Sequence, residues 1–585
     1  MNFNYKYSKW FFILLLVIIL KSSYSIAENN LDINILSASD EKIYREVFKL
    51  QSKQIKSKNS KIWKKIEKLK NQINNKILIG TLNADKYLHP TGWRSSYKEL
   101  KQWLNEYHDH PDAYKIYRLA LRRKPVKSKL PKKPSGDFLN GYGNISKDLI
   151  KPTFPLAKSK YKRDTFQIAI KVRRAIRRKN LDYVENLLSS KKTKQKLTNQ
   201  ELAQLRAKFA HAYFIFKEDE KSLRQARISV SLSGHKNALA FWSGGLASWR
   251  LGNLKSSKWF FNHLSDLKDG PESILSAGCF WSAKVAYHMG EYKSINRYLY
   301  SAIKYDRTFY STLSKASLGY QDNYDFKLQN ISKQFILKLK SLQAGRRILG
   351  LLQISEYHKA SREFRKIIFN FNEKEYPQII SFASNNNMPG FAFRLSAILR
   401  NDYNKILLGG LYPVPDWDFS TLPIKDKSLL FSISRQESGF NPRAKSYANA
   451  LGLMQVLPST ASFIMKDRAY RKKEILFDEE KNLFVASKYI QFLFDLDIIK
   501  KDVSKMLASY NAGPGNFSKW SKKFHTTEID PIFMIETLPA RQTRNYIKLV
   551  LTNLWIYKIR LKEKPNLLFK LASGSIPKYE YKNDR

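Results

Sequence analysis

The sequence predicts an all-α protein, and three observations carry that prediction. Apolar residues recur at helical spacing in many segments, for example at Ile62, Ile66, Leu69 and Ile73. No run of alternating apolar and polar residues with hairpin signals appears before residue 560, so we do not expect a substantial sheet. A short internal repeat indicates that helices form pairs and that the pairs stack side by side.

The internal repeat joins a bulky aromatic helix, a tight glycine turn and a second helix. Residues 241–243, Phe-Trp-Ser, recur as residues 280–282, and the Gly252 turn recurs at Gly290. A looser copy of the turn begins at Ser355. Each such unit buries its apolar face only against its neighbours, so we expect a helical superhelix. Chance similarity among aromatic-rich helices is the alternative.

Two stretches rich in proline and glycine interrupt the helical pattern. We expect a long irregular connection over residues 124–164 and a boundary near residue 405, just before Gly-Gly-Leu-Tyr-Pro-Val-Pro at 409–415. The predicted domains are a signal peptide (1–27), an α-superhelical domain (28–325), a helical linker domain (326–405) and a C-terminal domain (406–585).

The charge of the chain is strongly positive. Its 585 residues carry 104 Lys and Arg against 50 Asp and Glu, a formal net charge of +54. Such a balance attracts polyanions, among them nucleic acid, anionic membranes and acidic peptides. The lysines are spread along the whole chain and no nucleic-acid motif stands out, so we do not expect nucleic acid as a partner.

The first residues have the three-part pattern of a secretory signal peptide. Lys6 and Lys9 precede an apolar run from Trp10 to Leu20, and Ser25-Ile26-Ala27 places small residues before a cleavage point. The apolar run is too short for a spanning helix, so we expect no stable membrane anchor after cleavage.

Neither the single cysteine nor the close histidine pair suggests a chemical site. Cys279 lies in an apolar context and is interpreted as a buried small side chain, and one cysteine cannot form an internal disulfide. His108-Asp109-His110 lacks the spacing of a metal-binding helix, so we interpret it as a solvated turn before Pro111. We expect no metal and no cofactor.

Glu437 is the strongest candidate for a catalytic side chain. It ends an apolar helix that carries Leu430 and Ile433, and Gly439 suits the position just past a helix end. Apolar neighbours and the negative end of the helix dipole both disfavour a charged carboxylate, so the pKa of Glu437 should be raised. A carboxylic acid that stays protonated near neutral pH can act as a general acid. A surface glutamate at a frayed helix end is the alternative.

Three later motifs add polar groups around this candidate acid. Gly452-Leu453-Met454-Gln455 precedes Pro458, a suitable helix start, and Gln455 offers a donor and an acceptor to a sugar. Tyr510-Asn511 comes just before a Gly-Pro-Gly helix end at 513–515. The last motif contains Glu536 and Tyr546. Met454 taken alone would more often be a core residue than a contact.

Together the four motifs resemble those of the family 1 lytic transglycosylases, which have a lysozyme-like catalytic domain. The resemblance extends to Leu88-His89-Pro90-Thr91 and to Thr308-Phe309-Tyr310-Ser311 in the helical part. Two positions depart from the family pattern, Leu457 and Asn449. The resemblance implies a superhelix shaped as a ring or a U, followed by a lysozyme-like α domain. It implies Glu437 as the sole acid and base, with substrate contacts from Ser438, Ser446, Met454, Gln455, Tyr510, Asn511, Glu536 and Tyr546.

The resemblance also implies a function. The expected enzyme is a periplasmic lytic transglycosylase of a Gram-negative bacterium that cuts the MurNAc–GlcNAc bond of peptidoglycan from strand ends and forms 1,6-anhydroMurNAc. Peptidoglycan strands would be its partner, other cell-wall enzymes are further candidates, and a monomer is expected. The alternatives are a muramidase that admits water, a non-catalytic peptidoglycan-binding scaffold and a helical-repeat interaction protein.

Overall fold

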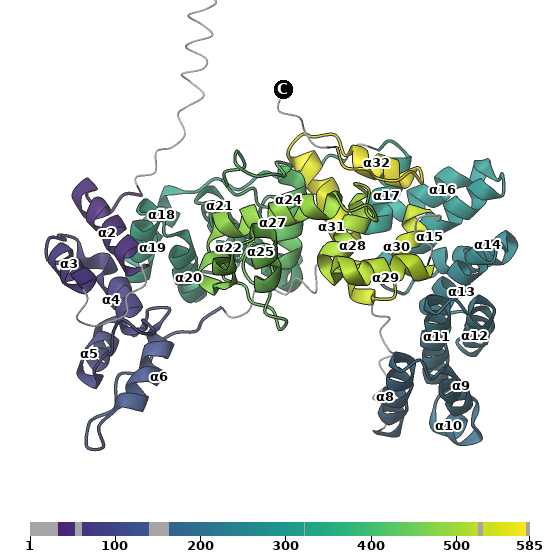
Figure 1. Cartoon of the computed structure of the whole chain (residues 1–585), viewed down its shortest axis with the longest axis horizontal. Coiled ribbons are helices and arrows are strands. Elements are labelled where there is room, and N and C mark those ends of the chain that lie inside the picture. The colour runs from purple at the N-terminus through teal and green to yellow at the C-terminus, as the bar shows by residue number, and fades with distance from the viewer. Residues whose placement is uncertain (1–32, 53–60, 140–162, 321, 525–529, 581–585) are drawn as a thin grey trace, which may run out of the picture. The chain divides into compact units, whose positions relative to one another are not determined.

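The computed structural model describes residues 33–52, 61–139, 163–320, 322–524 and 530–580, and helices make up the regular secondary structure of this part of the chain (Figure 1). Its β-structure consists of three isolated bridges: Lys445 with Leu451, Leu451 with Val456, and Asp502 with Lys578. The all-α prediction is confirmed. The predicted signal peptide lies outside the described residues, and no described helix is long and apolar enough to cross a membrane.

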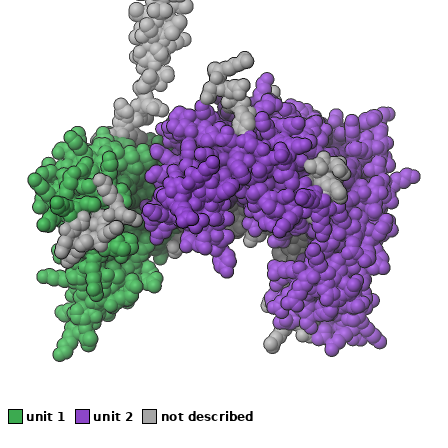
Figure 2. Space-filling model, in the orientation of Figure 1, with its two compact units in different colours: residues 1–141, 328–392 green, residues 142–327, 393–585 purple. Residues whose placement is uncertain are grey.

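The chain forms two compact units, each built from segments that are distant in sequence (Figure 2). Unit 1 comprises residues 1–141 and 328–392, and unit 2 comprises residues 142–327 and 393–585. This division rests on contacts within the fold. The domain boundaries expected from the sequence stay a prediction.

Unit 1 contains α2 (Ala38–Gln51), α3 (Lys61–Lys70), η1 (Lys76–Leu78), α4 (Ile79–Tyr87), α5 (Tyr97–Tyr107), α6 (Ala113–Arg123), α18 (Lys333–Ser341), α19 (Gln343–Gln353), α20 (Tyr357–Ile367), η2 (Ile368–Asn370), α21 (Tyr376–Asn385) and the start of α22 (Pro389–Tyr403). Helix α5 begins with a capping box, which Ser96 and Glu99 form. The buried side of α5 consists of Leu100, Trp103 and Leu104.

The first part of unit 2 is an array of ten helices among the described residues: α8 (Arg163–Arg177), α9 (Leu181–Ser189), α10 (Lys191–Lys196), α11 (Asn199–Ile215), α12 (Asp219–Leu232), α13 (Ala238–Arg250), α14 (Leu254–Ser265), α15 (Glu272–His288), α16 (Tyr292–Ile303) and α17 (Phe309–Ser317). From α11 to α16, each helix packs on the next one in the chain. The array is therefore a succession of stacked helix pairs.

The predicted repeat is confirmed as two helix–turn–helix units, α13–α14 and α15–α16. Gly252 and Gly290 join the helices with left-handed backbones, at φ of +72° and +74°. Glycine adopts this conformation without steric cost. Ser355 holds the same place in the looser copy between α19 and α20, at φ of +63°.

The second part of unit 2 contains the end of α22, α23 (Leu408–Leu411), α24 (Lys427–Glu437), α25 (Pro458–Met465), η3 (Arg468–Arg471), α26 (Lys473–Leu476), α27 (Glu479–Phe494), α28 (Val503–Ala512), α29 (Pro514–Phe524), α30 (Pro531–Thr537), α31 (Arg541–Arg560) and α32 (Asn566–Ala572). Helix α31 is the buried centre of this part and packs on α24, α28 and α17. One continuous apolar core joins these helices to the array, so both parts of unit 2 form one packed body.

Cys279 is buried in α15, as the sequence predicts. Burial raises the pKa of its thiol to about 11, which keeps the sulfur protonated and unreactive.

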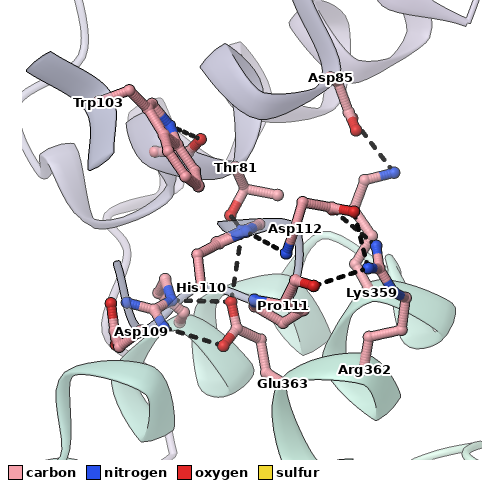
Figure 3. Close-up of polar contacts among 12 residues, drawn as sticks. Thr81, Asp85, Trp103, Asp109, His110, Pro111, Asp112, Lys359, Arg362 and Glu363 are labelled. Atoms are coloured by element: carbon pink, nitrogen blue, oxygen red, sulfur yellow. Dashed lines mark hydrogen bonds and ion pairs between the residues drawn. The ribbon is translucent and has the colours of Figure 1, made fainter. Parts of the chain in front are cut away.

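The interpretation of His108-Asp109-His110 as a solvated turn is wrong. His110 is buried, and its ring lies 3.2 Å from the Thr81 hydroxyl and 3.6 Å from the Glu363 carboxylate (Figure 3). Arg347 bridges Glu363 and Asp109, at 2.7 and 2.8 Å. Burial and the nearby arginines hold the pKa of His110 well below its usual range, so the ring stays neutral.

The turn therefore ties α5 and α6 to α19 and α20 inside unit 1. Its charged partners lie more than 200 residues further along the chain, so the local sequence does not predict these contacts. Among the described residues, no group of three or more His, Cys, Asp and Glu side chains is arranged to hold a metal ion.

Candidate active site

Glu437 is the last residue of α24, where the sequence places it. Asp426 caps the start of the helix: its carboxylate accepts the Leu429 N–H at 3.0 Å and pairs with Lys558 of α31 at 2.9 Å. The helix ends in a turn in which Gly439 has a φ of +58°. Both ends of α24 are thereby fixed, and α31 holds the helix from the side, so the position of Glu437 is set by rigid elements.

The Glu437 carboxyl sits in an environment that favours its neutral form. Burial raises its pKa to about 7, and the Tyr546 hydroxyl beside it partly offsets that effect. No basic side chain of the described residues forms an ion pair with Glu437. Glu437 is half-buried, so part of the residue stays open to solvent. The raised pKa expected from the sequence agrees with this structure.

Two tyrosines flank the acid. The Tyr546 hydroxyl on α31 is buried and makes no hydrogen bond of good geometry to a described group, although it lies close enough to Glu437 to influence its pKa. Tyr510, near the end of α28, lies within electrostatic range of Glu437 and donates its hydroxyl to the Met454 carbonyl at 2.7 Å. The structure therefore brings both predicted tyrosines to the acid.

The Gly452–Gln455 turn is built around a buried asparagine. The Asn482 amide donates to the Leu451 and Leu476 carbonyls and accepts the Met454 N–H, at distances between 2.8 and 3.0 Å. Gly452 has a φ of +79°, and a Cβ atom there would lie 2.2 Å from the Asn482 amide nitrogen. Only glycine permits this approach, which explains the first residue of the motif.

Gln455 and Ser446 shape the loop between α24 and α25. The Gln455 amide group donates to the Gly452 and Ala444 carbonyls at 2.8 and 3.2 Å, and no described bond uses its oxygen. The Ser446 hydroxyl accepts the Ala450 N–H at 2.9 Å. Asn449 has a left-handed backbone at φ of +62°, which asparagine tolerates better than most residues.

Met454 and Ser438 differ from the expected substrate contacts. The Met454 side chain has no exposed surface, and its sulfur lies 2.8 Å from the Ser434 hydroxyl. The Ser438 side chain is also buried, and its hydroxyl accepts the Asn441 N–H at 3.1 Å. In this structure both side chains support the fold of the loops, and neither presents a surface to a ligand.

Side chains from α17 and α31 hold Asn511 and Glu536 in place. Asn511 accepts the Thr543 hydroxyl of α31 at 2.9 Å. Glu536 is buried, accepts the Tyr310 hydroxyl at 2.6 Å and pairs with Lys548 at 2.9 Å. Tyr310 belongs to the Thr-Phe-Tyr-Ser stretch of the array, so this stretch anchors α30. A substrate contact by Glu536 stays a prediction.

Sequence reasoning missed Tyr489 and Asn482, both on α27. The Tyr489 ring centroid lies 5.4 Å from that of Tyr510, and the Tyr489 hydroxyl is within electrostatic range of Tyr546. Both residues sit in an ordinary helical pattern without a turn or a glycine beside them. The alignment of α27 with α28 brings them to the site, and a single sequence carries no signal for that.

Comparisons with known proteins show what this chain resembles. The family model described as "Transglycosylase SLT domain" matches residues 423–533, which include Glu437 and the motifs through Asn511. The chain carries an SLT domain. Its sequence is 24% identical over 305 residues to the soluble lytic murein transglycosylase of Escherichia coli K12, covering 49% of this chain and 44% of that protein.

Other relatives are more similar in sequence but match over less length. The membrane-bound lytic murein transglycosylase C of Histophilus somni strain 2336 is 36% identical over 141 residues, covering 21% of this chain and 39% of that protein. The chain thus spans about half the length or less of the curated relatives it matches.

The solved structure of an inactive mutant of the lytic transglycosylase Slt from Pseudomonas aeruginosa shares the fold. Its TM-score is 0.53 at 18% identity, and the match covers 89% of this chain and 79% of that one. This likeness extends the comparison beyond the SLT domain to the helical array.

Proposed function

We propose that the protein is a lytic transglycosylase that cuts the glycan strands of peptidoglycan, with Glu437 as its only acid and base. The observation that carries the proposal is a half-buried carboxyl group that forms no ion pair with a described residue and has a pKa of about 7, flanked by two tyrosines in an SLT domain. Half of such groups are protonated near neutral pH, so the group can both give and accept a proton.

The proposed reaction needs one carboxyl group. Glu437 protonates the oxygen that links MurNAc to GlcNAc, and this bond breaks as positive charge develops on the MurNAc ring. The C6 hydroxyl of the same sugar then attacks the charged carbon and loses its proton to the Glu437 carboxylate. The product is 1,6-anhydroMurNAc, and Glu437 ends the cycle protonated. An attack from within one molecule has a high effective concentration, so no second carboxylate is required to position a nucleophile.

The remaining predicted contacts take supporting roles in this proposal. Tyr510 and Tyr546 both lie within electrostatic range of Glu437, and the Tyr546 hydroxyl is available to bond to a sugar or to the ionised Glu437. Gln455, Ser446 and Asn511 would bind the sugars on either side of the cut. Glu536 would act through Lys548 and Tyr310 by fixing α30 beside α31.

Resemblance alone supports the wider setting of the reaction. We place the protein in the periplasm after removal of residues 1–27, acting from the ends of peptidoglycan strands as a monomer. Other cell-wall enzymes remain candidate partners, and the anionic peptides of peptidoglycan would suit the net charge of +54.

Digestion of purified peptidoglycan tests the proposed function. The mature protein should release soluble glycan fragments, and Glu437→Gln should release none while still binding the insoluble material. Glu474→Gln is the matched control, because Glu474 is an exposed glutamate of the same unit. Release of fragments by Glu437→Gln at the wild-type rate would refute the role of Glu437.

A further inference from the structure

A row of aromatic rings leads away from the catalytic acid along α27 and α25. The row starts at Tyr510, which lies 5.4 Å from Tyr489 between ring centroids. Tyr489 stacks on Phe492 at 6.4 Å with ring planes 17° apart. Phe492 meets the Phe463 ring edge at 5.6 Å. All four rings belong to unit 2, so their spacing is fixed within one packed body.

The far end of the row is the most exposed. Tyr510, Tyr489 and Phe492 are half-buried, and Phe463 at the far end is 64% exposed. Helix α25 uses Ala461 and Ile464 for its buried side, which leaves Phe463 on the outer side.

Single exposed apolar residues are common on protein surfaces and need no function. The row differs because it is continuous. Each ring contacts the next, and the first ring lies within electrostatic range of Glu437. A ligand held at the acid that extends along this side would meet the faces or edges of Phe492 and Phe463 next.

The chemistry of the row suits a sugar chain. A pyranose ring has apolar C–H faces and carries its polar groups around the rim, so a flat aromatic ring can cover a face without needing a hydrogen bond. The ring next to the acid is a tyrosine with its hydroxyl engaged, whereas the outer two rings have no polar atoms. The outer rings therefore suit binding without chemistry.

We propose that Phe492 and Phe463 form a subsite for a sugar of the glycan strand, beyond the sugars that flank the cut bond. The inference rests on the proposed function for the identity of its ligand. The subsite takes an N-acetylated pyranose of the same strand and gives the enzyme a preference for longer strands. Phe463 acts here as a specificity residue and has no part in the proton transfers.

Cleavage of peptide-free glycan strands of two lengths tests the subsite. The short strand fills only the sites beside the cut, and the long strand extends further in both directions. In Phe463→Ala, the ratio of kcat/KM for the long strand to that for the short strand should fall by about threefold to tenfold, as expected for loss of one aromatic contact. Phe463→Tyr keeps the ring and should keep the ratio, whereas Phe463→Leu keeps apolar area without a ring and should lose it.

Tyr292→Ala is the matched control, because Tyr292 is 65% exposed on α16 of the same unit and lies outside the row. An unchanged ratio in Phe463→Ala would overturn the proposal, and so would an equal loss on both strands. A change of oligomeric state in Phe463→Ala without a change of ratio would assign the ring to contact with a second copy instead.

Binding separates this proposal from the proposed function. If the wild type cleaves neither strand, the proposed function fails, and calorimetry with Glu437→Gln still compares the affinities for the two strands. A preference for the long strand that Phe463→Ala removes would support the subsite even then. Equal affinities for both strands would overturn it.

Discussion

Replacing Glu437 with glutamine should stabilise the fold above neutral pH. Burial raises the pKa of this carboxyl from 4.5 to about 7, so the folded protein holds a proton that the unfolded chain releases between these values. Below pH 4.5 the carboxyl is protonated in both states and has no effect. As pH rises through this window the wild type loses stability, and the loss is complete above pH 7. Glutamine cannot ionise, so the variant avoids that loss.

The size of the effect follows from the pKa shift. Each unit corresponds to about 1.4 kcal/mol, so the full shift gives an upper bound of about 3 kcal/mol. Partial exposure of Glu437 lets water reduce that figure, and we expect about 1 to 3 kcal/mol. Such a gain is characteristic of an active-site group whose environment serves chemistry at the expense of stability.

Urea unfolding of wild type and Glu437→Gln at pH 4 and pH 8 measures this difference. Comparing the two proteins at each pH cancels the other titrating groups, and Glu474→Gln controls for loss of an exposed carboxylate. We expect the free energy of unfolding of the variant, relative to that of the wild type, to be larger at pH 8 than at pH 4. The control should show no such difference. A difference that stays constant with pH would refute the reasoning, because it would mean that burial does not perturb Glu437.

Three further predictions concern the neighbours of the acid. Tyr546→Phe removes the hydroxyl that lowers the Glu437 pKa. The decline of kcat/KM on the alkaline side should therefore occur at a higher pH, by about one pH unit or less, and a decline at a lower pH would contradict this. Asn482→Ala breaks three buried hydrogen bonds and should cost about 3 kcal/mol in urea unfolding, with a loss of activity; a cost under about 1 kcal/mol would show that the turn does not depend on this side chain. Glu536→Gln leaves Lys548 unpaired and should destabilise the fold by about 2 kcal/mol in the same assay, whereas unchanged stability would remove the anchoring role of Glu536.

Much of the fold could be predicted from the sequence because glycine and proline residues mark where helices end and begin. Glycines in left-handed turns often mark helix ends, and the structure has a helix end at Gly252 and at Gly439. The same local logic placed Glu437 at the end of an apolar helix and Pro458 at the start of the next one.

Features that depend on distant partners were not predictable. His110 is buried against Glu363, which pairs with Arg347, and both of these residues lie far along the chain. Tyr489 reaches the site only through the packing of α27 against α28. Met454 was expected to contact the substrate because it belongs to a motif of substrate-binding residues. Its side chain is buried in the core, and its backbone carbonyl accepts the Tyr510 hydroxyl. A motif therefore identifies the turn correctly without specifying which of its atoms face the ligand.

Mass spectrometry of the soluble products from purified peptidoglycan tests the central claim most directly. The wild type should yield fragments that end in 1,6-anhydroMurNAc, lighter by one water molecule than hydrolysed fragments, and Glu437→Gln should yield none. Hydrated ends from the wild type would make the enzyme a muramidase, and anhydro ends from Glu437→Gln would show that another group is the acid.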